Sequence, residues 1–223
     1  MVNKSIALDG PAGAGKSTLA KKLAKHFGLI YVDTGALYRC IGLFAYRNNV
    51  ASKDREGVTA LLPQISIEMK YDGTGIQRML LCGEDVTDAI RMPVISTYAS
   101  DVSAMPEVRD YLLSMQRDMA EKYDVIMDGR DIGTVVLPNA GLKIFMTADA
   151  EVRAKRRYLE LVEKGVNTTI EEVLNEMVSR DKNDSEREIA PLKAADDAII
   201  LDTTDLDFDK SFIALCKLIE MLP

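Results

Sequence analysis

The chain has few of the residues from which many catalytic and metal-binding sites are built. It contains one histidine, His26, and three cysteines, Cys40, Cys82 and Cys216, with no Cys-x-x-Cys pair. An odd number of widely separated cysteines gives no disulfide framework, so we expect buried or half-buried thiols in a reducing compartment. A single histidine supports neither a catalytic triad nor a metal cluster, and we expect it on a helix surface.

Long apolar runs and an excess of basic residues are also lacking. No stretch approaches the roughly 18 apolar residues of a membrane span, and the polar segment 1–9 does not resemble a signal peptide. The chain has 28 Lys and Arg against 35 Asp and Glu, whereas nucleic-acid binding requires a basic surface. We therefore expect a cytoplasmic monomer without membrane or nucleic-acid partners. A small phosphorylated ligand stays compatible, because a few convergent arginines can bind it.

The order of sequence patterns predicts an α/β protein. Near-continuous apolar runs are typical of central parallel strands, and they lie at Ser5–Leu8, Leu29–Val32, Val125–Met127, Leu142–Met146 and Ala198–Leu201. Helical patterns cover Lys16–Phe27, Pro106–Glu121, Ala150–Lys164 and Asp209–Met221, and a capping box at Thr169–Glu172 opens another helix through Ser179. Two arms, 65–71 and 76–82, flank the turn Asp72–Gly75 and predict an antiparallel hairpin inserted into a single domain of 223 residues.

A phosphate-binding loop follows the first predicted strand. The sequence Gly10-Pro11-Ala12-Gly13-Ala14-Gly15-Lys16-Ser17, followed by Thr18, matches G-x-x-x-x-G-K-[ST]. Glycines let backbone N–H groups surround phosphate oxygens, and the next helix directs its positive end at the same anion. We predict that residues 10–18 bind ATP, that Lys16 reaches its β- and γ-phosphates, and that Ser17 ligates Mg²⁺. The alternative is a Gly-rich turn without a ligand; an N-K-x-D segment that reads guanine is absent.

A second motif, Asp33–Arg39, follows the second predicted strand at the edge where α/β proteins bind ligands. Thr34 offers a hydroxyl group, Gly35 permits a tight turn, and Arg39 offers a planar fork for the phosphate of an acceptor. The alternative is a helix N-cap followed by a surface arginine.

The third predicted strand ends at Asp128, where P-loop proteins often place a carboxylate near the metal. Arg130 and Asp131 follow, and an isolated salt bridge between them is the alternative to a binding role. Two arginine sets come later. Arg153, Arg156 and Arg157 share one helix face, and Arg180, Asp184 and Arg187 have helical spacing. Both sets fit a solvated charged surface, with Glu160 or Asp149 pairing at least one arginine, or cations above a transferred phosphoryl group.

Five motifs in the same order resemble the bacterial cytidylate kinase family of nucleoside monophosphate kinases. They are residues 10–18, 33–39, Gly83–Arg91, Asp128–Pro138 and Arg180–Asp184 with Arg187. The resemblance covers nearly the whole chain. It implies a P-loop kinase fold with a core (about 1–35, 101–147 and 190–223), an acceptor-binding insertion (about 36–100) and a lid (about 148–189).

The resemblance also implies roles for single residues. Arg130 binds the acceptor phosphate, Asp131 binds the cytosine base, and Ser100 and Arg109 occupy the other base-contacting positions. Arg180, Asp184 and Arg187 bind the acceptor, the last two at its sugar; Arg156 belongs to the ATP site and Arg157 to the catalytic set. The base assignment has a chemical basis, because cytosine offers an N4 amino donor where uracil offers a carbonyl oxygen.

These residues predict direct in-line transfer from ATP to CMP or dCMP with Mg²⁺. Lys16, Arg130, Arg157 and Asp128 form the predicted catalytic set. The attacking oxygen belongs to a phosphate that is already charged, so no general base is needed. The alternatives are a kinase for UMP, AMP or an alcohol, and a P-loop regulatory module.

Overall fold

The computed structural model describes residues 4–72, 77–163 and 165–222. The chain forms two compact units, one of residues 1–31 with 120–223 (unit 1) and one of residues 32–119 (unit 2). Each unit is described by itself. Most of the predicted hairpin turn and Lys164, the last residue of a predicted helix, lie outside the described residues.

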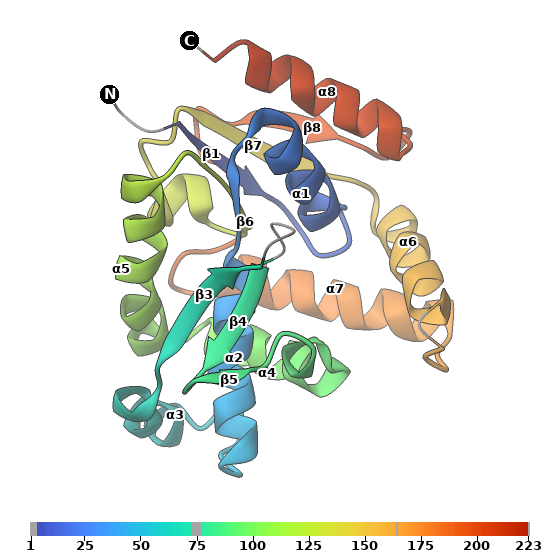
Figure 1. Cartoon of the computed structure of the whole chain (residues 1–223). Helices are drawn as coiled ribbons and strands as arrows, with labels where there is room; N and C mark the ends of the chain where they lie inside the picture. The colour runs from blue at the N-terminus through green and yellow to red at the C-terminus, as the bar shows by residue number, and fades with distance from the viewer. Residues whose placement is uncertain (1–3, 73–76, 164, 223) are drawn as a thin grey trace. The chain divides into compact units, whose positions relative to one another are not determined.

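A five-stranded sheet forms the centre of unit 1 (Figure 1). Its order is β2-β6-β1-β7-β8, with β1 at Ser5–Asp9, β2 at Ile30–Asp33, β6 at Val125–Gly129, β7 at Leu142–Thr147 and β8 at Ile199–Asp202. Strand β2 begins in unit 1 and ends in unit 2. The pairs β1–β6, β1–β7 and β7–β8 are parallel. The register pairs Leu8 with Asp128 and Asp9 with Gly129. It therefore aligns the carboxyl end of β1, where the P-loop begins, with the carboxyl end of β6.

Helices α1 (Lys16–Phe27) and α8 (Phe208–Glu220) pack together beside this sheet. Leu23 of α1 and Leu215 of α8 are fully buried in one core with Ile6 and Leu8 of β1. Helices α6 (Ala150–Glu163) and α7 (Ile170–Glu186) pack on each other through a small cluster that includes Ala154. A one-turn π-helix, η3 (Ile132–Val136), follows β6. Helix α5 (Pro106–Lys122) begins in unit 2 and ends in unit 1.

Unit 2 combines helices with a small antiparallel sheet. Its helices are α2 (Thr34–Arg47), α3 (Arg55–Leu61) and α4 (Pro93–Val102), with 3₁₀ turns η1 (Leu62–Gln64) and η2 (Ala89–Arg91). Strands β3 (Ile67–Tyr71), β4 (Gln77–Leu81) and β5 (Glu84–Asp85) form the sheet in that order. Helices α2 and α4 approach closely, since a Cβ atom on Gly42 would lie 2.9 Å from the Cβ atom of Tyr98.

The predicted fold class is confirmed, because a central parallel sheet carries flanking helices and a small antiparallel sheet accompanies it. The predicted hairpin is β3–β4, and the capping box of Thr169 and Glu172 opens α7. Helix α7 continues past Ser179 to Glu186. The division into core, insertion and lid stays a prediction.

Two local expectations were wrong. Gly35 lies in the first turn of α2 instead of a tight turn, because Asp33 caps that helix by accepting a hydrogen bond from Ala36 N at 3.0 Å. Cys82 is exposed, whereas Cys40 is buried and Cys216 is half-buried; all three are free thiols. His26 is exposed on α1, as expected. None of the helices within the described ranges is long and apolar enough to cross a membrane.

Candidate nucleotide-binding site

The P-loop of unit 1 connects β1 to α1. Gly10 has φ 146°, and a Cβ atom there would lie 1.9 Å from the carbonyl oxygen of Met146, so no other residue fits. The loop ends at Gly15, and α1 begins at Lys16 with its N–H groups facing the loop. Lys16 is only 5% exposed, and its Nζ atom donates a hydrogen bond to the Pro11 carbonyl oxygen at 2.7 Å. The lysine is thus held inside the loop.

Three cations influence one another at this loop. Burial lowers the pKa of Lys16 to about 7, and the positive charges of Arg130 and Arg180 lower it further against the opposing effect of Asp128 and Asp9. Burial and the charge of Arg130 likewise lower the pKa of Arg180. The Nε atom of Arg180 is buried and has no hydrogen-bond partner among the described residues. Neighbouring cations that disfavour the charged states of Lys16 and Arg180 favour a bound anion.

A hydroxyl–carboxylate pair lies beside the loop. The Ser17 Oγ atom donates to Asp128 Oδ2 at 2.6 Å, and the Tyr31 hydroxyl donates to Asp128 Oδ1 at 2.9 Å. Mg²⁺ takes hydroxyl and carboxylate oxygens as ligands. Its other ligands are commonly oxygens of phosphates and water. No cluster of three or more His, Cys, Asp or Glu side chains suited to a metal occurs in the part of the chain that the structure describes. The donor set therefore fits an ion that is held largely by a nucleotide.

Two ion pairs link the segment after β6 to the end of α7. Arg130 Nε donates to Asp184 Oδ2 at 2.8 Å, and Arg187 Nη2 donates to Asp131 Oδ1 at 3.2 Å. Arg130 and Asp131 therefore have different charged partners, which argues against an isolated pair between them. Although burial opposes it, the carboxylate of Asp184 raises the pKa of Arg130. Arg187 caps α7 in an extended conformation, so the helical spacing predicted for it ends at Glu186.

The three arginines of α6 have separate environments. Arg153 is 7% exposed, and its Nη1 atom donates to Asp181 Oδ2 and to the Ala12 carbonyl oxygen at 3.0 Å. The same carboxylate accepts a hydrogen bond from Ala12 N at 3.2 Å. Arg153 therefore joins α6 and α7 to the P-loop, and this burial excludes the solvated-surface interpretation for it.

Arg156 donates to the carbonyl oxygens of Thr203 and Leu206 at 2.7 and 3.0 Å, in the segment between β8 and α8. Arg157 pairs with Glu160 at 2.8 Å on the surface of α6, as the sequence predicted for at least one arginine of this set. An ATP-binding role for Arg156 and a catalytic role for Arg157 stay predictions.

Unit 2 contains the remaining predicted acceptor residues. Thr34 is buried at the start of α2, and Arg39 on the same helix donates to Ser96 Oγ at 2.8 Å and to the Ile90 carbonyl oxygen at 3.2 Å. Arg109 donates to the Ser103 carbonyl oxygen at 3.2 Å, and its guanidinium lies 5.7 Å from the ring centre of Tyr38. Ser100 of α4 has a buried Oγ atom without a partner among the described residues. Within unit 2, Arg109 of α5 thus lies over the ring of Tyr38, the residue that precedes Arg39 on α2.

For the motif Asp33–Arg39, the alternative interpretation was a helix N-cap followed by a surface arginine. The first half is confirmed, because Asp33 caps α2. The other half described Arg39 as a surface arginine, but Arg39 is half-buried. Asp33 also accepts from Arg91 Nη2 at 2.7 Å. A binding role for Thr34 and Arg39 stays a prediction.

Sequence reasoning missed three polar residues of unit 1. Asp9 is 4% exposed at the end of β1, Tyr31 holds Asp128, and Asp181 binds both Arg153 and Ala12. Asp9 could have been found, because a carboxylate between a buried strand and a P-loop is unusual. The partners of Tyr31 and Asp181 lie far away in sequence, and no local pattern signals them.

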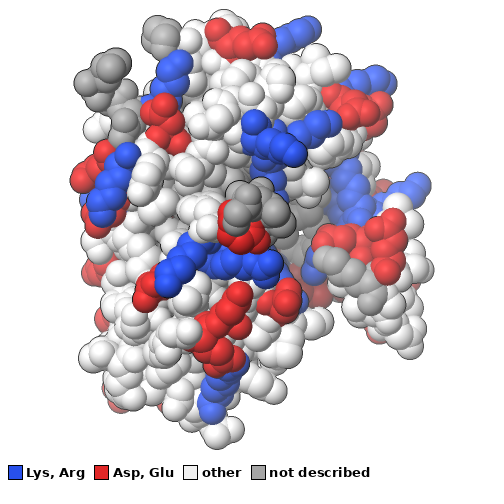
Figure 2. All heavy atoms as spheres, viewed as in Figure 1, with Lys and Arg blue, Asp and Glu red and all other residues white. Residues whose placement is uncertain are grey.

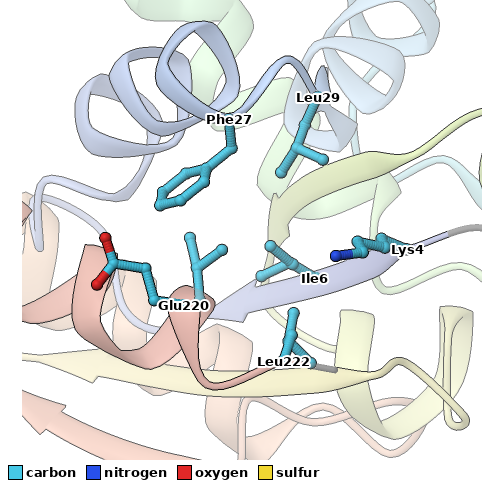
Figure 3. Close-up of a pocket in the computed structure, with 7 residues that line it drawn as sticks. Lys4, Ile6, Phe27, Leu29, Glu220 and Leu222 are labelled. Carbon is cyan, nitrogen blue, oxygen red and sulfur yellow. The ribbon is translucent and has the colours of Figure 1, made fainter.

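The opposite end of β1 has a different character. A cavity of about 210 Å³ is lined there by Lys4, Ile6, Phe27, Leu29, Ile219, Glu220 and Leu222. In Figure 3, carbon side chains of Ile6, Phe27, Leu29 and Leu222 face this space. No convergent set of cations lines it. Figure 2 shows basic side chains in several separate groups, with acidic side chains close to most of them.

Comparison with known proteins gives a consistent result. A sequence model of the family described as cytidylate kinase matches residues 6–220. The cytidylate kinase of Caldicellulosiruptor bescii is 51% identical over 217 residues, which are 97% of this chain and 94% of that protein. The cytidylate kinase of Clostridium botulinum strain Langeland is 46% identical over 220 residues, 99% of both proteins. A solved structure of an uncharacterized protein from Eubacterium ventriosum is similar in fold, with a TM-score of 0.54, 16% identity and coverage of 98% and 99%.

Proposed function

Because this chain belongs to the cytidylate kinase family, we propose that it transfers the γ-phosphoryl group of ATP to the phosphate of CMP, giving CDP and ADP. We propose dCMP as a second acceptor. The transfer is direct, without a covalent enzyme intermediate.

One observation in the structure carries this proposal. Arg130 and Arg180, which are far from Lys16 in sequence, lie close enough in unit 1 for their charges to lower the pKa of Lys16, and the charge of Arg130 also lowers the pKa of Arg180. Such a cluster is costly in the absence of an anion, and it is suited to the charge on a phosphoryl group in transfer. A regulatory P-loop module has no need for two further arginines at the loop.

The chain's own residues supply most of the proposed mechanism. The amides of residues 10–18 and the Lys16 ammonium hold the donor phosphates, and Arg130 binds the acceptor phosphate. Together with Arg157 they balance the charge on the equatorial oxygens of a loose transition state. Because Lys16 is buried and Arg130 is held by Asp184 before substrate binds, these two groups require little reorganisation during transfer.

We propose Ser17 as the Mg²⁺ ligand and Asp128 as the carboxylate that orients it. Mg²⁺ at this position neutralises phosphate charge on the donor. Tyr31 holds the second carboxylate oxygen of Asp128, which fixes the direction of the first.

Asp131 is the proposed determinant of the base. Its carboxylate accepts a hydrogen bond from cytosine N4, whereas uracil presents O4 and leaves both acceptors unpaired. In this proposal Arg187, which pairs with Asp131 at 3.2 Å, holds the carboxylate in its direction. Thr34, Arg39, Ser100, Arg109, Arg180 and Asp184 complete the proposed acceptor set.

The function is tested by coupled detection of ADP with CMP, dCMP, UMP and AMP as acceptors. We expect the highest kcat/KM with CMP, a measurable value with dCMP, and slow ATP hydrolysis when no acceptor is present. Rapid ADP release without acceptor, or a preference for AMP, would contradict the proposal.

The base assignment is tested by Asp131→Ala. We expect the CMP:UMP ratio of kcat/KM to fall by about a hundredfold, because a site that hydrogen-bonds a substrate strongly rejects an analogue that mismatches it. Asp209→Ala is the matched control, since Asp209 is an exposed carboxylate on α8 of the same unit. An unchanged ratio in Asp131→Ala would show that another residue reads the base.

We also propose that the protein is a monomer in the cytoplasm. Size-exclusion chromatography with light scattering at assay concentration tests the first part, and a dimer mass would contradict it. Fractionation of the source cells tests the second.

A further inference from the structure

Asp9 is a buried carboxylate that the proposed mechanism does not use. It is the last residue of β1, directly before the P-loop, and it is 4% exposed. Its Oδ1 atom accepts a hydrogen bond from Ile132 N at 2.8 Å, and its Oδ2 atom accepts one from Gly133 N at 2.7 Å. Both oxygens are therefore directed at the amino end of η3.

The residue that would normally bind the Gly133 amide, which is the second of this helix, is Asp131. It occupies the N-cap position of η3, where an aspartate usually accepts from backbone N–H groups of its own helix. Asp131 makes no such bond, and its carboxylate accepts from Arg187 instead. The carboxylate of Asp9, which belongs to β1, therefore caps this helix, and the carboxylate of Asp131 is paired with Arg187.

The packing around Gly133 fixes this arrangement. A Cβ atom on Gly133 would lie 3.2 Å from Lys143 Cδ and 3.4 Å from Asp9 Oδ2. Lys143 is itself held at its other end by Asp197, at 2.8 Å. A side chain at position 133 would therefore be crowded against the groups that surround the hydrogen bond between Gly133 N and Asp9.

We propose that Asp9 is a positioning residue for acceptor selection: by capping η3, it lets the carboxylate of Asp131, which pairs with Arg187, be directed at the acceptor's base and not at the amides of its own helix. This inference rests on the proposed function. Without Asp9, the unpaired Gly133 amide attracts the Asp131 carboxylate, because an unsatisfied buried N–H group is costly. Asp131 then turns toward its own helix and away from the base.

The effect on kinetics distinguishes positioning from a general structural role. General weakening of the fold lowers the rates with all acceptors by one factor. Displacement of Asp131 lowers the rate with CMP more than the rate with UMP, because only cytosine offers N4 to the carboxylate. The CMP:UMP ratio of kcat/KM therefore reports on the position of Asp131.

The test is Asp9→Asn, which keeps the size of the side chain but replaces one acceptor oxygen by a donor. We expect the CMP:UMP ratio to fall about tenfold, which corresponds to one misplaced hydrogen bond, and the KM for ATP to stay within about twofold of wild type. In the background Asp131→Ala, Asp9→Asn should cause no further fall in the ratio, because residues that act together are not additive. Ile219→Val, a core change in α8, is the control for general destabilisation.

Gly133→Ala provides a second route if Asp9→Asn fails to fold. Its methyl group would press on the Lys143 stem and on Asp9 Oδ2, so it should lower the same ratio with Asp9 still present. Equal loss with CMP and UMP in both variants would overturn the inference, as would a further fall of the ratio in the double variant. Wild-type activity with CMP in the same assay is the separate test of the proposed function.

Discussion

The two ends of strand β1 differ in chemistry. At the carboxyl end, Asp9 and the P-loop with Lys16 lie among charged side chains, most of them buried. At the amino end, Ile6 lines a cavity of about 210 Å³ together with other apolar side chains and with Lys4 and Glu220. The cavity has volume without convergent charge, whereas the loop has convergent charge. The comparison teaches that clustered ionisable groups with perturbed pKa values mark the candidate site here, and that empty volume does not.

The largest effect expected from this comparison is that of Lys16→Ala at the carboxyl end. Removing a buried cation from the phosphate site should lower kcat/KM about 10²–10³-fold with every acceptor, as for a lost preorganised donor. Coupled ADP detection with CMP and UMP measures this. Lys22→Ala is the matched control, because Lys22 is an exposed lysine of the same helix that pairs with Asp209. A fall of less than about tenfold would break the comparison.

The pH dependence of folding stability tests the burial of Asp9. Burial raises the pKa of Asp9 from 3.8 to about 6, against the amides of Gly133 and Ile132. A raised pKa in the folded state stabilises the protein below about pH 4, and this contribution is lost as the pH rises through about 6. The stability of wild type relative to Asp9→Asn should therefore be about 2–3 kcal/mol more favourable at pH 4 than at pH 7, at about 1.4 kcal/mol per pKa unit. Urea unfolding of both proteins measures it. If the stability of wild type relative to Asp9→Asn increased with pH, the pKa of Asp9 would not be raised in the folded protein.

Asp128 lies at the same end of the sheet, and we expect Asp128→Asn to lower activity less than Lys16→Ala does. It weakens the acceptor of the Ser17 hydroxyl group, so we expect kcat to fall about 10–100-fold and half-maximal activity to require more Mg²⁺. Tyr31→Phe, which removes only the other hydrogen bond to this carboxylate, should show the same direction with a smaller change. Titration of activity against Mg²⁺ measures both variants. Unchanged Mg²⁺ dependence in Asp128→Asn would remove this residue from the metal site.

The smallest effect is expected at the amino end. Ile6→Val removes one methyl group beside the cavity and should destabilise the fold by about 0.5–1.5 kcal/mol, without altering kcat or KM for CMP or ATP. Urea unfolding and the coupled assay measure the two effects. A change in either kinetic constant would show that the apolar end contributes to function and would weaken the contrast.

Much of the fold could be predicted from the sequence because its local signals are strong. Helix α1 was predicted with the observed bounds, since Gly15 and Gly28 cap it with positive φ. Helix α2 was missed because its residues are buried on most sides, so the sequence lacks the alternation of a surface helix. Strand β5 was missed because two residues give no pattern.

The candidate site could be predicted from the sequence only where a motif contains its residues. Lys16 and Ser17 follow from the P-loop pattern, and Asp128 follows from its place after a strand. The contacts of Tyr31 with Asp128 and of Asp9 with η3 join segments about a hundred residues apart in sequence. These contacts form because burial and strand register bring the partners together, and the sequence alone specifies neither.

The most direct test of the account is a crystal structure with an analogue in which cytidine and adenosine are joined through five phosphates. We predict that the P-loop amides and Lys16 contact the phosphates on the adenosine side and that Arg130 and Arg180 contact the same chain of phosphates. Arg39, Arg109 and Arg187 should converge on the cytidine side, with Asp131 at N4 of the base. If the phosphates lay away from Lys16, Arg130 and Arg180, the central claim would be contradicted.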